Sequence, residues 1–543
     1  MFGAGGGTSS YAEVEIADVV VLWGSNAREA HPIFFHHVLK AIHKGARLFV
    51  IDPRRTSTAA WADEHLQLDV GTDIALASAM AREIIAAGLV NREFVENATS
   101  GFDALRAHVE PWTLDAAALV TGVPAEQIRA VAHAWAKADK AQICWTLGIT
   151  EHHNAVDNVV SLINLGLLCG HVGREGSGIN PLRGQNNVQG GGDMGALPNK
   201  LTGFQDVADP VVRAKFDAAW GSRMPAENGW NLTQMFHAME HGDLTGVLVI
   251  GENPAQSDAD VGRVRRLLGE LDVLIVQDLF LTRTAELADV VFPASAAWCE
   301  ADGTVTNSER RVQRVRAALK PPGEAKDDIW ILAQLARRLG VDLGEPTPQE
   351  LWDELRKLSP MHAGMSWARL EAEGGIQWPC PSDDSPGAQR LHERLWKVPC
   401  EGPRAPFQCV DHAPPVEALS PEYPFRLTTG RRLDAYNTGV QSQGIDSPLY
   451  RNESVDLAPA DAARLGVVSG EVVRVASRRG TVEAEVRVDA GLKPGLVFMT
   501  WHDPDQVDTN LLTIDATDPK AGTAEFKACA VNVSAISQAS AAK

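Results

Sequence analysis

The sequence predicts an α/β multidomain fold, with two related doubly wound α/β lobes and a carboxy-terminal β-barrel domain. Three observations support this prediction. Strand-like runs alternate with helical segments in two separate parts of the chain, the two parts share one sequence pattern, and alternating β patterns dominate after Pro421. The 543 residues, 45% of them hydrophobic, exceed the needs of one core, so several packed domains are expected.

The alternation of strands and helices is the first of these observations. Short β-rich runs are each followed by a longer segment with helical periodicity, an order typical of βαβ units that form parallel sheets. The strand-like runs are 19–23, 48–51, 247–250, 273–276 and 290–292, and the helical patterns are 31–43, 74–87 and 258–268.

An internal repeat relates the two lobes. Residues 52–63 and 278–289 share the pattern D-x-x-x-T-x-T-A-x-x-A-D, and each follows a strand that ends in a Gly-x-Asn turn, at Gly24 and at Gly251. Such turns alone are more often plain strand-to-helix connections, but the matched downstream pattern favours a shared ligand role. Ligands of open α/β sheets bind beyond the carboxyl ends of the strands, so two lobes predict two nucleotide-like ligands.

A glycine-rich segment, residues 170–195, joins the lobes and is not expected to fold as a simple helix. Within it Arg183 lies among four amide side chains, and its rigid guanidinium fork suits a carboxylate or phosphate. The residues support either an anion-binding loop or a polar loop that joins two domains. They do not name the anion.

The last part of the chain, residues 405–543, is predicted to be the β-barrel domain. Residues 482–488 alternate apolar and polar side chains after a turn at 477–480, which is typical of a β-hairpin. Further strands are expected at 496–501 and 529–533. One short helix is predicted between Pro459 and Gly466.

Composition and charge exclude several classes of protein. A net charge of -20 and a pI of about 5.3 argue against nucleic-acid binding. No targeting signal precedes residue 11 and no apolar run approaches the roughly 18 residues that span a bilayer, so a cytoplasmic protein without a membrane span is expected. The seven cysteines form no C-x-x-C pair, so no metal site is predicted from them and they are expected to be mostly buried thiols.

The segment Leu182-Arg-Gly-Gln-Asn-Asn-Val-Gln-Gly190, followed by Asp193-Met-Gly-Ala, resembles the signature loop of the alpha (catalytic) subunit of molybdopterin-dependent formate dehydrogenases. The resemblance covers nearly the whole chain. Other molybdopterin oxidoreductases, such as nitrate or sulfur-compound reductases, fit this loop less well. Further matching phrases are Gly24-Ser-Asn-Ala-Arg-Glu-Ala-His-Pro32, Leu147-Gly-Ile-Thr150, Gly251-Glu-Asn-Pro254, Gln277-Asp278 and Ile376-Gln-Trp-Pro379.

The resemblance implies two molybdopterin guanine dinucleotides around molybdenum or tungsten, one on each α/β lobe, closed by a barrel of the double-psi type. It places the first dinucleotide against Gly24, Ser25, Asn26, Glu29, Asp52, Arg54, Gly71, Asp73 and Gly148. It places the second against Gly251, Glu252, Asn253, Gln277, Asp278, Thr282 and Thr284. In the barrel the cofactor-contacting turns would contain Gly430, Arg431, Asn437, Thr438, Asn510, Phe526 and Lys527, although ordinary polar barrel residues explain these nearly as well.

The resemblance also implies the reaction. Arg183 matches the arginine that holds the formate carboxylate, and Gln185 matches its neighbour beside the pterin. Formate would be oxidised to carbon dioxide, or the reverse, with electrons passing to iron–sulfur or diaphorase partner subunits. Next to the turn at Gly148, His152 and His153 are read as a strand pair facing opposite ways, with at most one polar contact near the cofactor.

The sequence departs from the family pattern at its start. Family members open with a cysteine-rich segment for a 4Fe-4S cluster and a cysteine or selenocysteine–histidine pair, and neither is present. The chain alone is therefore expected to have little formate dehydrogenase activity. A non-catalytic cofactor-binding or scaffold subunit is the alternative. The expected regions are a first lobe (1–185), a second lobe (186–300), a connecting region with a remnant of the amino-terminal type of domain (301–404) and the barrel (405–543).

Overall fold

The computed structural model describes residues 1–3, 5–433, 435, 438 and 451–536. Its first lobe is built on a five-stranded parallel sheet with the order β3-β2-β1-β5-β6. The central strand β1 is flanked by β2 and β5 in matched register, because Val19 pairs with both Arg47 and Ala141. The strands are β1 (Val19–Trp23), β2 (Arg47–Ile51), β3 (Glu64–Leu66), β5 (Ala141–Trp145) and β6 (Gly178–Pro181).

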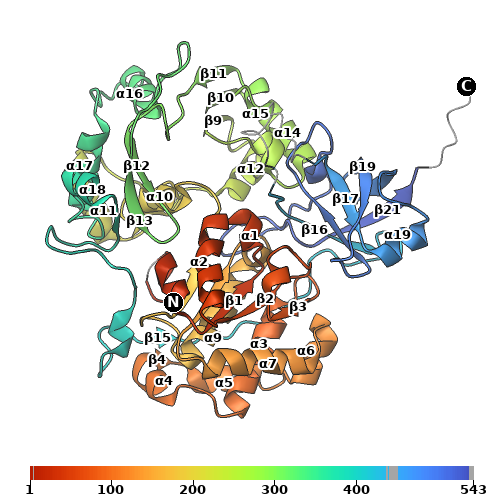
Figure 1. Ribbon diagram of the computed structural model, residues 1–543. Helices are drawn as coiled ribbons and strands as arrows, with labels where there is room; N and C mark the ends of the chain where they lie inside the picture. Colours follow the sequence, from red (N-terminus) through yellow and green to blue (C-terminus); the bar gives the residue numbers. More distant parts are fainter. Residues whose placement is uncertain (4, 434, 436–437, 439–450, 537–543) are drawn as a thin grey trace, which may run out of the picture.

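Helices cover both faces of this sheet, which makes the lobe doubly wound (Figure 1). Alternate residues of β1 divide between two cores: Val21 packs with one set of helices, whereas Val20 and Leu22 pack with α2 on the other face. The helices are α1 (Ala27–Ala30), α2 (Pro32–His43), α3 (Asp73–Ala86), α4 (Arg92–Ala98), α5 (Phe102–Val109), α6 (Leu114–Thr121), α7 (Ala125–Lys137), α8 (Leu147–Thr150) and α9 (Ala155–Cys169).

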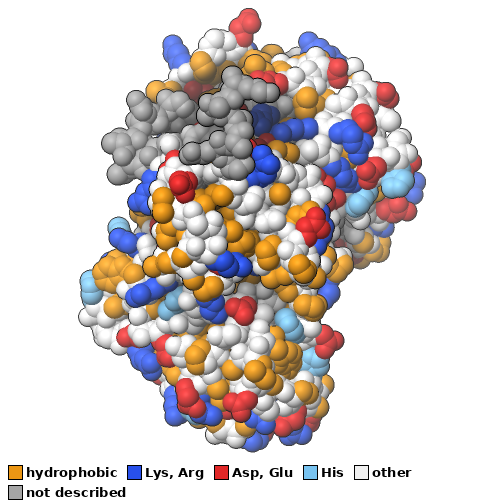
Figure 2. Space-filling view, turned by 90° about the vertical axis from the view of Figure 1, so that its right-hand side faces the viewer, with side chains coloured by type: hydrophobic (Ala, Val, Ile, Leu, Met, Phe, Trp, Pro, Cys, Tyr) orange, Lys and Arg blue, Asp and Glu red, His pale blue; other side chains and the backbone are white. Residues whose placement is uncertain are grey.

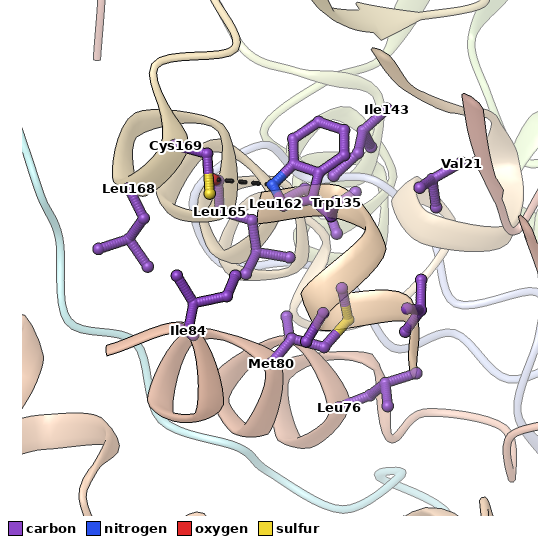
Figure 3. Close-up of a cluster of buried hydrophobic side chains, with 14 of the residues drawn as sticks. Val21, Leu76, Met80, Ile84, Trp135, Ile143, Leu162, Leu165, Leu168 and Cys169 are labelled. Atoms are coloured by element: carbon purple, nitrogen blue, oxygen red, sulfur yellow. Dashed lines mark hydrogen bonds between the residues drawn. The ribbon is translucent and has the colours of Figure 1, made fainter. Parts of the chain in front are cut away.

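The larger core lies between the sheet and helices α3, α7 and α9. Figure 3 shows Trp135 of α7 reaching across to α9, where its indole nitrogen donates to the carbonyl of Leu165 at 3.1 Å. Met80 and Ile84 of α3 close the same cluster. These contacts fix α3 and α9 against the sheet, so the turns at the carboxyl ends of the strands rest on a rigid base.

The second lobe has a smaller parallel sheet with the order β11-β10-β9. Its core, which includes Phe236, Leu267 and Val276, lies between this sheet and the helices that accompany it. The elements are β9 (Gly246–Ile250), β10 (Val273–Asp278), β11 (Val290–Pro293), α12 (Leu232–His241), α13 (Pro254–Ser257), α14 (Val261–Gly269) and α15 (Arg283–Glu286).

The repeat seen in the sequence is reproduced as hydrogen bonds. In the first lobe the side-chain oxygen of Asn26 accepts from the hydroxyl of Thr58 at 2.8 Å, and that hydroxyl accepts from the backbone N–H of Arg28. In the second lobe Asn253 accepts from Thr284 at 2.8 Å, and Thr284 accepts from a backbone N–H in the same way. The two α/β lobes are therefore related in detail, as the shared pattern predicted.

Both threonine hydroxyls are fully buried, so their loss should destabilise the fold. Replacing Thr58 or Thr284 with valine removes the hydroxyl that bonds to an asparagine oxygen and to a backbone N–H. We therefore expect each change to lower the free energy of unfolding by about 2 kcal/mol. Chemical denaturation measures this, with Thr58→Ser and Thr284→Ser as controls that keep the hydroxyl. Valine variants as stable as the serine variants would contradict the prediction.

A third sheet, β12-β13-β14, is antiparallel. It contacts residues that lie within the expected second lobe, 186–300. Trp220 donates to Glu354, and the side chain of Gln205 donates to the carbonyl of Leu358, so residues 205–220 contact this region. The elements are β12 (Gly303–Thr306), β13 (Arg311–Val315), β14 (Ile376–Gln377), α10 (Val188–Asp193), α11 (Pro210–Trp220), α16 (Asp328–Arg338), α17 (Pro348–Leu358) and α18 (Trp367–Glu373).

This arrangement refines the expectation for the glycine-rich segment. It was not expected to fold as a simple helix and does not, but it is not all loop either: its first part adds β6 to the first sheet and its last part forms the short helix α10. Asn187 precedes this helix in a left-handed conformation, and its side-chain oxygen accepts from the backbone N–H of Thr306 of β12, which ties the start of the helix to the third sheet. The loop proper is reduced to the residues around Arg183. The boundaries of the four expected regions stay a prediction.

The carboxy-terminal domain is a closed six-stranded barrel with the order β16-β20-β17-β19-β18-β21 (Figure 1). The predicted hairpin is confirmed, because β18 and β19 pair antiparallel across the turn that contains Gly480, and the predicted helix is α19 (Pro459–Leu465). The strands are β16 (Phe425–Thr429), β17 (Ser454–Leu457), β18 (Val472–Ala476), β19 (Thr481–Val488), β20 (Leu496–Met499) and β21 (Cys529–Ala535).

The surface and the cysteines follow the sequence predictions in part. Figure 2 looks at the barrel side of the molecule and shows basic and acidic side chains interspersed over that face. Four of the seven cysteines are buried, and only Cys409 is exposed. No helix in the described part of the chain is long and apolar enough to cross a membrane.

Candidate active site

A cavity of about 1130 Å³, counting the part open to solvent, lies between the first lobe and the barrel. The carboxyl ends of β1, β2 and β5 form its floor, as expected for an open α/β sheet. The barrel contributes the end of β16 and residues from two later loops. The lining residues are Gly24, Asn26, Ala30, His31, Ile51, Asp52, Pro53, Arg54, Leu68, Val70, Gly71, Asp73, Thr146, Leu147, Gly148, His152, Leu182, Gly184, Gln185, Thr428, Thr429, Gly430, Arg431, Trp501 and Lys527.

Two glycines let the turns after β1 and β5 touch backbone to backbone on the cavity floor. A Cβ added to Gly148 would lie 2.6 Å from the Cα of Gly24, and Gly24 itself has a φ of +57°. The hydroxyl of Thr146 and the N–H of Gly148 both donate to the carbonyl of Gly24, at 2.7 and 3.2 Å. Only glycine allows this contact, which keeps the floor flat and open to a ligand.

Two buried carboxyls supply hydrogen-bond acceptors. Asp52 follows β2 and accepts from the backbone N–H of Arg54 at 2.9 Å, while Asp73 begins α3 and accepts from the indole of Trp23 at 2.8 Å. Burial raises the pKa of both carboxyls, with opposite charges nearby acting against it. Each keeps oxygen lone pairs for the donors of a ligand.

Cationic side chains line the barrel side of the cavity. The guanidinium of Arg54 stacks on the ring of Phe498 of β20 at 3.5 Å, which holds it in place. The ammonium of Lys527 donates to the carbonyl of Thr429 at 3.1 Å and pairs with Glu151 at 2.6 Å. Arg431 is anchored by the carbonyl of Ala435 at 3.0 Å. Guanidinium and ammonium groups fixed in this way suit phosphate oxygens.

A few buried polar atoms have no hydrogen-bond partner among the described residues. In the part of the chain that the structure describes, His31 Nδ1 at the cavity, Ser25 Oγ in the fully buried turn after β1 and Gln277 Oε1 in the second lobe are such atoms. Such atoms are rare in native proteins and point to a ligand or water. The donor and acceptor set around the cavity, with its two carboxyls, three cations and close glycines, fits a phosphate-containing dinucleotide.

The neighbouring histidines His152 and His153 correct a sequence prediction. They lie in a turn after α8, not in a strand, and both contact one buried carboxylate, Glu525, at 3.2 and 3.4 Å. His152 also lines the cavity. The contact could not be read from the sequence because Glu525 follows more than 300 residues later, in the barrel domain.

The pair formed by His152 and Glu525 is sensitive to pH. Burial opposes the charge on each group, but their mutual attraction outweighs it, so the pKa of Glu525 is lowered from 4.5 and the pKa of His152 is raised from 6.5. A lowered carboxyl pKa contributes stability above pH 4.5 that is lost as the pH falls toward the folded value. A raised histidine pKa contributes stability below pH 6.5 that is lost as the pH rises through the folded value.

Glu525→Gln should therefore destabilise the protein most between pH 4.5 and 6.5, where both charged forms are present in full. We expect the difference in unfolding free energy between wild type and variant to shrink above that window as His152 loses its proton. Denaturant titrations at a series of pH values measure it. Glu371→Gln, at an exposed ion pair, is the control and should give a difference that hardly changes with pH. A flat difference for Glu525→Gln would contradict the prediction.

The loop around Arg183 lies at the rim of the cavity. Leu182, Gly184 and Gln185 line it, whereas the side chain of Arg183 leaves the loop toward Gly5 and Gln189. The imidazole of His31 donates from Nε2 to the backbone carbonyl of Arg183 at 2.8 Å. Burial lowers the pKa of His31 and so favours the neutral ring, while the hydrogen bond to the carbonyl of Arg183 acts against this effect.

The second predicted site is assembled around the turn after β9. Gly251 donates its N–H to the carbonyl of Gln277, and the side chain of Gln277 donates to Asp328 at 2.6 Å. Asp278 accepts from two following backbone N–H groups, at 2.6 and 3.3 Å, and Thr282 caps α15. Burial raises the pKa of Glu252 and of Asp278.

The predicted barrel residues divide between the two sites. Gly430, Arg431 and Lys527 line the first cavity. By contrast, Thr438 and Asn510 contact α13 beside the second site, through hydrogen bonds of 2.6 and 2.9 Å with Gln256. Phe526 packs on Trp501 and donates its N–H to the carbonyl of Glu151. Asn437 lies outside the described residues.

Two protein-family models match this chain. The molybdopterin oxidoreductase model matches residues 4–338, and the molybdopterin dinucleotide binding domain model matches residues 425–530. The chain belongs to the molybdopterin oxidoreductase family. The second match assigns molybdopterin dinucleotide binding to the barrel of this oxidoreductase.

Individual relatives of this molybdopterin oxidoreductase confirm the resemblance stated from the sequence. F420-dependent formate dehydrogenase 2 subunit alpha of Methanococcus maripaludis is 42% identical over 98% of this chain and 79% of its own length. Formate dehydrogenase H of Escherichia coli is 36% identical over 100% of this chain and 76% of its own length. The solved structure of acetylene hydratase from Pelobacter acetylenicus superposes with a TM-score of 0.76 at 21% identity, covering 98% of this chain and 80% of that one, which shows the shared fold.

Most predicted first-lobe residues of this molybdopterin oxidoreductase meet at one cavity: Gly24, Asn26, Asp52, Arg54, Gly71, Asp73 and Gly148 all line it. Two do not line it: Ser25 is fully buried, and Glu29 accepts from the hydroxyl of Ser57. Sequence analysis missed His31 and Trp501. The only sequence signal for His31 was its position within the matching phrase from Gly24 to Pro32. In the described residues no three His, Cys, Asp or Glu side chains are grouped to hold a metal ion.

Proposed function

We propose that this molybdopterin oxidoreductase binds two molybdopterin guanine dinucleotides, one in the cavity of the first lobe and one at the matching turn of the second. The repeated hydrogen bonds of Asn26 with Thr58 and of Asn253 with Thr284 support two equivalent sites. Gln277 Oε1, which has no hydrogen-bond partner among the described residues, supports a ligand in the second lobe.

In the first cavity, the residues divide by the chemistry of the dinucleotide. The carboxylate of Asp73 would accept from the N–H donors on the edge of guanine, and Asp52 would accept from ribose hydroxyls. Arg54 and Lys527 would pair with the pyrophosphate, and the glycine floor at Gly24 and Gly148 would let the ligand approach the backbone.

We propose that the reaction is the oxidation of formate to carbon dioxide, or its reverse. The observation that carries this is Arg183, whose Nη1 makes no hydrogen bond with any described residue while Nε and Nη2 are held. Arg183 is not among the residues that line the cavity, but its Nη1 would donate to a small carboxylate bound next to the rim, beside Gln185. The formate dehydrogenase names of the relatives support the same substrate.

The metal bound by the two pterins, molybdenum or tungsten, would supply the two-electron redox chemistry. The protein would hold and orient the formate carboxylate through Arg183 and keep that charge fixed during the reaction. Electrons would then pass to a 4Fe-4S cluster and to iron–sulfur or diaphorase subunits, as expected for formate dehydrogenases.

The test is the cofactor content and substrate preference of the enzyme purified with its cofactor. We expect two guanine nucleotides released per molybdenum or tungsten atom, saturable binding of formate, and only a low rate of formate-dependent dye reduction by this chain alone. One nucleotide per metal would overturn the second site. Oxidation of reduced dye by nitrate without formate turnover would favour another molybdopterin oxidoreductase, and a protein without metal would favour a scaffold subunit.

A further inference from the structure

We infer that Gln189, Asp193 and Trp378 form a buried positioning relay, which fixes the guanidinium of Arg183 so that its Nη1 faces the substrate carboxylate. The inference rests on the proposed role of Arg183 in formate binding. It adds three residues that make no contact with substrate and act through Arg183.

The relay is a continuous chain of hydrogen bonds. Arg183 Nε donates to Gln189 Oε1 at 3.1 Å, and Gln189 Nε2 donates to Asp193 Oδ1 at 2.9 Å. The indole nitrogen of Trp378 donates to the other oxygen of Asp193 at 2.7 Å. The three relay side chains are 2%, 0% and 3% exposed, so no bulk water competes with these bonds.

The direction of every bond in the relay is fixed by its ends. Arg183 and the indole of Trp378 can only donate, so Gln189 must accept from Arg183 and Asp193 must accept from Trp378. An ionised Asp193 can only accept and therefore takes a proton of the Gln189 amide. That leaves the amide oxygen of Gln189 facing Arg183, and the opposite amide orientation would place N–H against N–H.

The backbone carbonyl of Gly5 completes the clamp. It accepts from Arg183 Nη2 at 3.0 Å and from Gln189 Nε2 at 3.1 Å, so it holds the same two side chains together. Two nitrogens of the guanidinium are thereby occupied on one edge. Because the group is planar and rigid, fixing these two nitrogens also fixes the direction in which Nη1 points.

Asp193 also supplies a counter-charge. Arg183 and Arg310 are the charged groups that face it, from the loop after β6 and from the turn before β13. Burial lowers the pKa of Arg183 and Asp193 opposes this effect. Burial also raises the pKa of Asp193 to about 6, against the effect of its hydrogen bonds and the two arginines, so the carboxylate is ionised at neutral pH.

Asp193→Asn tests the relay because it keeps the size of the side chain and changes only what it can accept. The asparagine NH2 can donate to Gln189, which favours the wrong orientation of that amide. We expect formate affinity, measured by isothermal titration of the cofactor-loaded enzyme, to fall about tenfold. The loss of one charge-assisted hydrogen bond has an effect of about this size. Trp378→Phe, which keeps an aromatic ring, should weaken binding less.

A double variant separates positioning from general damage. If Asp193 acts only through Arg183, then Arg183→Lys with Asp193→Asn should bind formate as Arg183→Lys does alone. Asp461→Asn is the matched control, because Asp461 is equally buried but lies in α19 of the barrel and accepts from Gly495 and Arg464. Its formate affinity should equal that of wild type.

The pH profile is the readout that a purely structural role would not move. As the pH falls below about 6, Asp193 gains a proton, can donate to Gln189 and loosens the relay. We expect formate affinity of the wild type to fall there and that of Asp193→Asn to stay level.

The outcomes distinguish the relay from the proposed function. If Arg183→Lys leaves formate binding unchanged, the role of Arg183 is wrong. If Arg183→Lys weakens binding but Asp193→Asn does not, or if the double variant is additive, the relay is wrong while the function stands.

Discussion

Gly148→Ala is expected to abolish dinucleotide binding and to destabilise the first lobe. The added Cβ would lie 2.6 Å from both the Cα and the carbonyl oxygen of Gly24, and these are backbone atoms that cannot rotate away. The turns after β1 and β5 would have to separate, which costs about 3 kcal/mol at the upper end of what overpacking costs. Thermal unfolding and the guanine nucleotide content of the purified protein measure the two effects.

The control for this variant is Gly269→Ala, because Gly269 ends α14 with no neighbouring atom within 4 Å of an added Cβ. It should keep both the melting temperature and the nucleotide content. If Gly148→Ala retained a full nucleotide content, the turns would be free to separate and the glycine contact would not shape the site.

The parts of the fold that sequence analysis predicted are those with local signals. Strand–helix alternation and the Gly-x-Asn turns depend on residues close together in the chain, so β1, β2, β9 and β10 fell where expected. The repeat was informative for the same reason, since Thr58 and Thr284 each bond to a turn about 30 residues away. A shared pattern of this length predicts shared hydrogen bonds.

Contacts between distant segments carried no such signal. Trp378 lies in the phrase Ile376-Gln-Trp-Pro379, which was recognised by resemblance, yet its bond to Asp193 joins residues 185 positions apart. The same holds for Glu525 and the two histidines. The reading of that histidine pair as a strand was wrong because the alternation rule applies only in extended chain, and these residues lie in a turn.

Arg183→Lys is expected to lower formate affinity by about 10- to 100-fold, because lysine keeps the charge but loses the planar fork. In the structure two nitrogens of the fork bind Gln189 and Gly5 while the third stays available. A lysine ammonium is a single centre, so it cannot bind these two partners and still present a separate donor to the substrate. Formate titration of the cofactor-loaded enzyme measures the loss of affinity, and dye reduction measures the loss of turnover.

The size of that loss tests the geometry as well as the charge. Arg337→Lys, at an exposed ion pair with Asp342, is the control and should change nothing. If charge alone held formate, Arg183→Lys would keep most of its affinity and Arg183→Gln would lose it. If the fixed fork holds formate, both variants lose formate affinity. Raising the formate concentration then restores the turnover of the lysine variant only in part, because a carboxylate held by a mobile ammonium is less well oriented for reaction.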